Sequence, residues 1–227
     1  MSQSSDGSPL SASALAVVVF KPCGVPSQSD PSGDPDAMTL TARALADNGE
    51  PSELWLIHRL DRCVSGLLIF ARNKRSAALL SESVRERAIT KEYLAVVTGD
   101  APSGELCDLL YKDSRTGKAY VTDRARTGVK EARLTATPVA KREGLTLVAV
   151  ELHTGRFHQI RAQLSARHAS IVGDKKYGSR VGMKGGIALS AYHLAVEFGS
   201  ERVDVRCLPD TEEYPWCLFE EIKRFGE

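Results

Sequence analysis

The sequence predicts an α+β fold, a single domain over residues 14–227 in which a large, mostly antiparallel mixed β-sheet is flanked by helices around a central cleft. Strand-like segments follow one another directly, joined by turns such as Arg115-Thr116-Gly117 and Arg142-Glu143-Gly144. Only a few segments have helical periodicity. No stretch rich in Pro, Gly or Ser interrupts the pattern, so we expect one domain around one sheet.

The first half of the chain alternates strands with helices. We expect residues 1–13 to form a disordered tail, and Ala14–Phe20 to be a buried strand because the run is almost wholly apolar. Thr39 is a candidate N-cap for a helix through Ala46, since a threonine side chain can accept from an unpaired backbone N–H. The other elements expected here are strands over Leu54–Ile57, Gly66–Ala71 and Lys91–Thr98 and a helix over Lys74–Ala88.

The second half is dominated by β-hairpins from Glu105 to Thr154. Gly155 separates the alternating strand Leu145–Leu152 from a predicted helix over Arg156–Arg167. The remaining predictions are inward-facing Phe157, Ile160 and Leu164 on that helix, strands over Ile187–Phe198 and Arg202–Cys207 joined at Gly199-Ser200, and a C-terminal amphipathic helix carrying Trp216, Phe219 and Ile222.

The composition of the chain bears on its partners, its metal content and its cellular compartment. With 30 basic against 29 acidic residues, the whole molecule does not attract polyanions, so any nucleic-acid binding must come from local clusters. The 5 cysteines are scattered and never spaced as C-x-x-C, which favours a reducing compartment without structural zinc. Neither a secretory signal nor an apolar run of membrane-spanning length is present in the sequence. We therefore expect a cytoplasmic protein.

The stretch His58 to Arg72 sets a single carboxylate, Asp61, in a polar turn between two apolar strands. Arg59 and Arg62 lie beside it in the sequence, and an adjacent guanidinium lowers the pKa of a carboxyl by roughly 1 to 3 units. An ionised aspartate of this kind can act as nucleophile or general base. A structural Asp–Arg ion pair at a turn is an equally good interpretation of the same residues.

A second polar cluster runs from His153 to Arg161, where a strand meets Gly155 and then the predicted helix. The unpaired N–H groups of a first helical turn favour anions. His158 and Arg161 are three residues apart, so on a helix both could face one anion or carboxylate. The alternative is that His158 caps or packs. The spacing does not match a zinc motif.

Tyr93 lies on the expected strand Lys91–Thr98, either as an ordinary half-buried aromatic or as a ring offered for stacking. Taken together, the motifs resemble the signature series of the RluA-type RNA pseudouridine synthases, in order from about residue 17 to residue 207. The series is Lys21-Pro22-x-Gly24, His58-Arg59-Leu60-Asp61 with Ser65-Gly66-Leu67-Leu68, Lys91-x-Tyr93, Thr154-Gly155-Arg156-x-His158-Gln159-Ile160-Arg161, and Gly173-Asp174-x-x-Tyr177-Gly178.

The resemblance implies an isomerase that converts uridines of rRNA or tRNA to pseudouridine without cofactor or metal. It makes Asp61 the catalytic residue, Arg161 its orienting partner, and Tyr93 the ring stacked on a base extruded from the RNA. Arg59 would fill the space that the base leaves, and Ile160 would line the substrate pocket. Residues expected to bind RNA are Arg62, Lys74, Arg75, Arg124, Arg126, Lys175 and Lys176.

The chain departs from the family pattern at Val64, Phe157 and Ser190, which affects pocket detail and RNA preference. Its first strand begins near residue 14, so we expect no N-terminal S4 module, and a monomer is the default. Whether Asp61 attacks the sugar or assists elimination stays open. Two other hypotheses remain: a non-catalytic RNA-binding factor on the same scaffold, and a glycosidase, which would need a pair of carboxylates.

Overall fold

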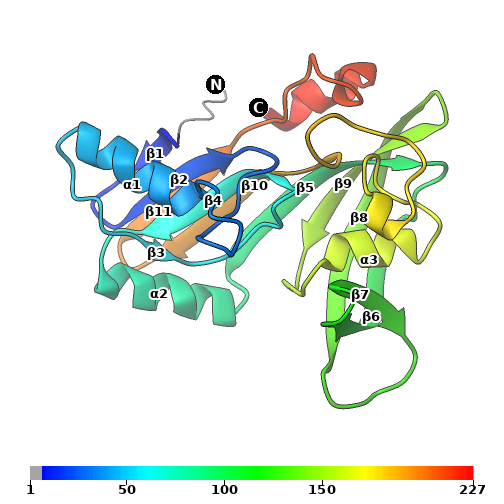
Figure 1. Ribbon diagram of the computed structural model, residues 1–227, viewed down its shortest axis with the longest axis horizontal. Coiled ribbons are helices and arrows are strands. Elements are labelled where there is room, and N and C mark those ends of the chain that lie inside the picture. The colour runs from blue at the N-terminus through cyan, green and yellow to red at the C-terminus, as the bar shows by residue number, and fades with distance from the viewer. Residues whose placement is uncertain (1–6, 227) are drawn as a thin grey trace. The chain divides into compact units, whose positions relative to one another are not determined.

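The computed structural model describes residues 7–226 (Figure 1). The chain divides into two compact units. The first unit comprises Met1–Thr90, Ser190–Asp210 and Phe225–Glu227, and the second comprises Lys91–Leu189 and Thr211–Arg224. Each has its own strands and helices, and nearly all strand pairs are antiparallel, which confirms the predicted α+β class with a mixed, mostly antiparallel sheet.

The centre of the first unit is formed by β2 (Ala16–Lys21), β4 (Ser65–Ala71) and β10 (Leu189–Phe198). Strand β2 pairs antiparallel with β4, which pairs in parallel with β10. All six residues of β2 are buried, which is expected for its five apolar residues but not for Lys21 at its end. The smaller strands are β1 (Pro9–Ala12) against β2, β3 (Trp55–Leu56) against β4, and β11 (Glu201–Arg206) against β10.

Gly66 is required where β4 meets β10. Its φ of 122° lies in the region that side chains rarely adopt, and a Cβ there would lie 2.4 Å from the backbone N and O of Ala191. Only glycine therefore allows this parallel pairing, in which Ala191 is the register partner of Gly66. The Ser65-Gly66 break seen in the sequence is thus a site of close backbone approach, five residues after Asp61.

The helices of the first unit are α1 (Ala37–Asp47) and α2 (Lys74–Arg85). The N-cap of α1 is Asp36, whose carboxylate accepts from the Thr39 N–H at 3.0 Å and the Thr39 hydroxyl at 2.7 Å. The prediction of Thr39 as N-cap was therefore wrong by one turn, because Asp36 is the better-placed acceptor. Helix α2 begins with a capping box at Asn73 and ends three residues before the predicted Ala88.

The second unit contains β5 (Ile89–Thr98), whose first two residues belong to the first unit, and the strands β6 (Gly104–Asp113), β7 (Lys118–Thr122), β8 (Val129–Arg142) and β9 (Leu145–Leu152). The strand order is β5-β9-β8-β6-β7, and every pair is antiparallel. Both predicted hairpin turns are confirmed, between β6 and β7 and between β8 and β9. Helix α3 (Gln159–Ser165) packs on β6 and β7 through Leu110, Ala119 and Ala162 (Figure 1).

Both ends of the chain differ from the prediction. Residues 1–6 of the expected tail lie outside the described residues, but Pro9–Ala12 form β1, whose backbone pairs with β2. At the other end, the predicted amphipathic helix is two 3₁₀ helices, Trp216–Leu218 and Glu220–Gly226. Trp216, Phe219 and Ile222 are nevertheless buried as predicted. Between residues 7 and 226, no helix is long and apolar enough to cross a membrane.

Candidate active site

Asp61 lies in the first unit, in the loop between β3 and β4. The backbone is fastened on both sides of it. The Ser27 hydroxyl accepts from the Leu60 N–H at 3.0 Å and donates to the Leu60 carbonyl at 2.9 Å. The Gly24 N–H donates to the Arg62 carbonyl at 2.8 Å. The loop that carries Asp61 is therefore held in place by the segment that follows β2. The half-buried Asp61 carboxylate thus projects from a backbone whose position is fixed.

The Lys21 side chain helps to hold this loop in place. Its side chain is fully buried, and Nζ donates to the carbonyls of Val25 at 2.8 Å, Pro22 at 2.9 Å and Arg62 at 3.3 Å. Desolvation lowers the pKa of Lys21 to about 8, although the nearby Cys23, Cys63 and Asp61 act in the opposite direction. In the sequence, Lys21 stands out only as part of a motif, because its burial depends on how the two loops meet.

The lowered pKa of Lys21 predicts a stability signature. Between the folded pKa of about 8 and the ordinary lysine pKa of 10.5, the unfolded chain binds a proton that the folded chain has lost, so stability rises with pH in this window. From pH 7 to about pH 9.5, the free energy of unfolding of the wild type should gain about 2 kcal/mol relative to Lys21→Met. Urea unfolding of both proteins at both pH values measures this difference. The contributions of the other titrating groups cancel, because wild type and Lys21→Met share them. A gap that stays constant or narrows with pH would show that Lys21 keeps an ordinary pKa.

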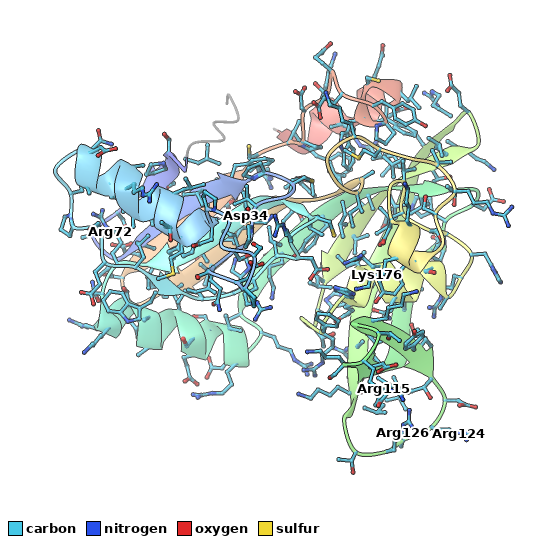
Figure 2. The ribbon with its side chains drawn as sticks, viewed as in Figure 1. Asp34, Arg72, Arg115, Arg124, Arg126 and Lys176 are labelled. Carbon is cyan, nitrogen blue, oxygen red and sulfur yellow. The ribbon has the colours of Figure 1, made fainter. Side chains whose placement is uncertain are left out.

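The two arginines beside Asp61 differ in their surroundings. Arg59 is exposed. Arg62 donates through Nε to the Gly24 carbonyl at 2.8 Å and through Nη1 to the Ser32 hydroxyl at 3.0 Å, and its Nη2 pairs with Asp34, which is labelled in Figure 2. The hydrogen bond from Arg62 lowers the pKa of the Asp34 carboxyl. The Arg62 side chain thus ties together the loop after β2, and its role as an RNA contact stays a prediction.

In the second unit, Arg161 lies on α3 and binds Asp174. Its Nε donates to Asp174 Oδ2 at 2.7 Å and its Nη2 to Oδ1 at 2.9 Å. Both side chains are buried, with 5% and 1% of their surface exposed. The guanidinium carbon lies 5.0 Å from the ring centroid of Tyr177. A two-pronged pair of this kind fixes the plane of the guanidinium as well as its position.

His158 packs, which was the alternative left open by the sequence. It has a left-handed φ of 52° immediately before α3, so it does not share a helical face with Arg161. Its ring stacks on Phe157 with centroids 3.8 Å apart, and its Nδ1 lies 2.9 Å from the Tyr177 hydroxyl. That hydroxyl also accepts from the Ala119 N–H at 2.7 Å. The predicted anion site shared by His158 and Arg161 is therefore not formed by a common helix face.

Gln159 explains why α3 begins later than the predicted Arg156. Its Oε1 accepts from the Arg156 N–H at 3.0 Å and from the Thr154 hydroxyl at 2.8 Å. The Thr154 hydroxyl in turn accepts from the Arg133 N–H at 2.8 Å. Since these contacts hold residues 154–156 against β8, that segment cannot continue the helix backwards.

The remaining substrate-contact candidates are also in the second unit. Tyr93 lies on β5 opposite Val150 and is buried, more deeply than the half-buried aromatic expected. Ile160 is buried on α3. Burial lowers the pKa of Lys91, two residues before Tyr93. The structure thus places Asp61 and Arg59 in the first unit, and Tyr93, Ile160 and Arg161 in the second.

Two further residues were missed as site candidates, Lys21 and Asp174. Both stand inside motifs quoted from the sequence, but nothing in the spacing alone tells which member of a motif the fold buries. Among residues 7–226, no group of three His, Cys, Asp or Glu side chains could hold a metal ion.

Comparison with known proteins assigns the chain to a family. A family model described as RNA pseudouridylate synthase matches residues 16–166, which include the Asp61 loop, Tyr93 and Arg161. The chain belongs to the RNA pseudouridylate synthase family. This confirms the resemblance deduced from the ordered motifs.

Curated relatives include members named for different RNAs. The chain is 35% identical over 154 residues to tRNA pseudouridine synthase C of Haemophilus ducreyi, covering 63% of each protein. It is 32% identical over 166 residues to ribosomal large subunit pseudouridine synthase D of Xanthomonas campestris, covering 71% of this chain and 49% of the relative. The chain therefore spans only about half the length of several relatives, among them a Bacillus subtilis protein at 54%.

A solved structure supports the fold. The human RNA pseudouridylate synthase domain containing 4 superposes with a TM-score of 0.72 over 89% of this chain and 88% of that chain, at 23% sequence identity. At this identity the likeness speaks for the fold alone.

Proposed function

We propose that this protein is an RNA pseudouridine synthase that isomerises specific uridines of rRNA or tRNA, acting as a cytoplasmic monomer without cofactor. The observation that carries the proposal is the family match over residues 16–166, together with the position of Asp61 on a loop whose backbone is hydrogen-bonded on both sides of it. A glycosidase is disfavoured, because that chemistry needs two carboxylates flanking the sugar and the second carboxylate of the motif series, Asp174, is buried in an ion pair with Arg161.

The proposed reaction breaks the bond between C1′ of the ribose and N1 of uracil and joins C1′ to C5 of the same base. The proton leaves C5 and N1 gains one, so nothing is oxidised and no water is consumed. Asp61 acts on the sugar either as a nucleophile at C1′ or as the base in an elimination at C2′. Both routes require the uracil to stay trapped between the two steps, which is best achieved by excluding water.

We propose that Tyr93, Ile160 and Arg161 contact the target nucleotide. A uridine inside folded RNA must leave its stack to be reached, and Tyr93 offers an aromatic face to the extruded base. Arg161 supplies a positive charge that keeps a carboxylate ionised, and its fixed plane, set by Asp174, supports this role. Arg59, which is exposed, fills the space left in the RNA.

Binding of the RNA is assigned to exposed basic side chains. The chain carries almost equal numbers of both charges, so phosphate contacts must come from local groups. Figure 2 shows Arg124 and Arg126 on the loop between β7 and β8 and Lys176 in the second unit. The proposed set also includes Arg62 and the other exposed lysines and arginines at Lys74, Arg75 and Lys175.

The proposal is tested by tritium release. RNA from a strain that lacks the gene is labelled at C5 of uridine and incubated with the purified protein, and tritium set free from C5 is counted. We expect release that saturates at a small fraction of the uridines, because the enzyme selects particular sites. If no cellular RNA releases label to a folded protein, the proposed activity is wrong and the RNA-binding factor becomes the better hypothesis.

Replacing Tyr93 with leucine should slow the reaction by about 10- to 100-fold, because stacking on an aromatic ring contributes about 1 to 3 kcal/mol per base. Leucine keeps the site apolar, so the loss reports on the flat ring. Single-turnover tritium release at saturating protein measures the effect. Tyr93→Phe is the matched control and should keep most of the rate, whereas equal rates for the leucine and wild-type proteins would place the ring away from the base.

A further inference from the structure

The hairpin of β6 and β7 presents two tyrosines on one face. Tyr111 and Tyr120 are direct register partners across the two strands. Leu110 and Ala119, their neighbours along the chain, face α3 and pack with Ala162. Since side chains alternate between the two faces of a strand, Tyr111 and Tyr120 point away from α3.

One of these rings is covered and the other is open. The Arg126 guanidinium lies over the Tyr111 ring, 4.1 Å from its centroid. Tyr120 is 43% exposed, and its hydroxyl lies 3.4 Å from that of Thr116 at the hairpin turn. The arrangement is a cation stacked on one ring, next to a second ring that is open to a further flat group.

The charge around these tyrosines is strongly positive. Residues 109–131 contain an excess of three basic over acidic side chains, whereas the whole chain has a net charge of only +1. Arg115, Arg124 and Arg126 are exposed at the hairpin and on the loop that follows it (Figure 2). The Lys176 side chain reaches the hairpin turn itself, since its Nζ lies 3.2 Å from the position of a Cβ added at Gly117.

We propose that this tyrosine face, composed of Tyr111, Tyr120, Arg124 and Arg126, binds an unpaired stretch of the RNA substrate. Tyr120 stacks on a base, and the two arginines contact the flanking phosphates. An aromatic ring can stack only on a base whose face is free, so the partner is single-stranded RNA rather than a duplex. This inference rests on the proposed function, because it assigns to that enzyme a second contact with its substrate, separate from the target uridine.

The test uses the full chain and a fluorescein-labelled oligouridylate of about twelve nucleotides, a length within the range bound by single-strand modules. Binding is followed by fluorescence anisotropy. Tyr120→Leu should weaken binding by about 5- to 20-fold, while Tyr120→Phe stays within about twofold of wild type. Tyr214→Leu is the matched control, because Tyr214 is 45% exposed in the same unit, and it should also stay within about twofold.

Two competitors define the partner. A blunt RNA duplex should bind the wild type and Tyr120→Leu equally, since it offers no free base to the ring. Polyglutamate should likewise show no dependence on Tyr120. If Tyr120→Leu weakens binding of either polyanion as much as it weakens binding of the oligouridylate, the face recognises charge or acidic protein and the inference is overturned. The inference is also overturned if Tyr120→Leu binds the oligouridylate as tightly as the wild type does.

Tritium release separates this inference from the proposed function. With cellular RNA, Tyr120→Leu should raise KM several-fold and leave kcat unchanged, because the ring acts on binding and not on the sugar. Binding of the oligouridylate that depends on Tyr120, without any tritium release, would support the tyrosine face and contradict the enzyme activity. Release with an unchanged KM in Tyr120→Leu would support the activity and remove the face from its substrate contacts.

Discussion

Replacing Asp61 with asparagine is expected to lower tritium release from RNA by at least about 10³-fold while the protein stays folded. An amide has nearly the same shape as a carboxylate but neither attacks a sugar carbon nor accepts a proton at neutral pH. The loop should keep its conformation, because Ser27 and Gly24 hold it through the backbone of Leu60 and Arg62. Single-turnover kinetics at saturating protein measures the loss.

Asp47→Asn is the matched control for this variant. Asp47 is the exposed last residue of α1 in the same unit, so the same chemical change there should leave the rate unaltered. Thermal unfolding of both variants checks that the fold is kept. An Asp61→Asn protein that retains a tenth or more of the activity would remove Asp61 from the chemistry, and one that complements a deletion strain would favour the RNA-binding factor.

Sequence patterns located the strands well, because local polarity reports burial directly. The apolar run that ends at Phe20 predicted a strand, and β2 is buried along its whole length. The turns at Arg115-Thr116-Gly117 and Arg142-Glu143-Gly144 were found because glycine relieves a backbone strain that is local to the turn. Periodicity and turn chemistry act over a few residues, and the fold class follows from them.

Helix boundaries and ion pairs depend on distant residues, so the sequence could not settle them. Helix α3 starts at Gln159 because the preceding turn is bonded to β8, a strand more than ten residues earlier. Arg161 was singled out as a partner for a carboxylate, but its partner Asp174 comes from a loop that only the folded chain brings to α3. The candidate site residues were found by the ordered motifs, whereas their contacts came from the structure.

The buried pair of Arg161 and Asp174 should be the most sensitive point of the second unit. Asp174→Ala removes the two carboxylate oxygens that bind the guanidinium and takes away the negative charge buried beside it, which costs about 3 to 5 kcal/mol of stability. We expect urea unfolding to show this loss for Asp174→Ala, and a loss of similar size for Arg161→Met. The double variant Arg161→Met with Asp174→Leu should recover much of the stability, because it replaces both charges with apolar groups.

The pair of Arg167 and Asp108 provides the comparison that isolates burial. It is also two-pronged, through Nη1 and Nη2 of Arg167 at 2.9 and 3.1 Å, and Arg167 lies just beyond α3, but the pair is more exposed to solvent. Asp108→Ala should therefore cost only about 1 kcal/mol. If both alanine variants lose the same stability, desolvation is not what makes the Asp174 pair strong. A double variant that stays inactive although its stability is restored would then separate the role of Arg161 in the reaction from its role in the fold.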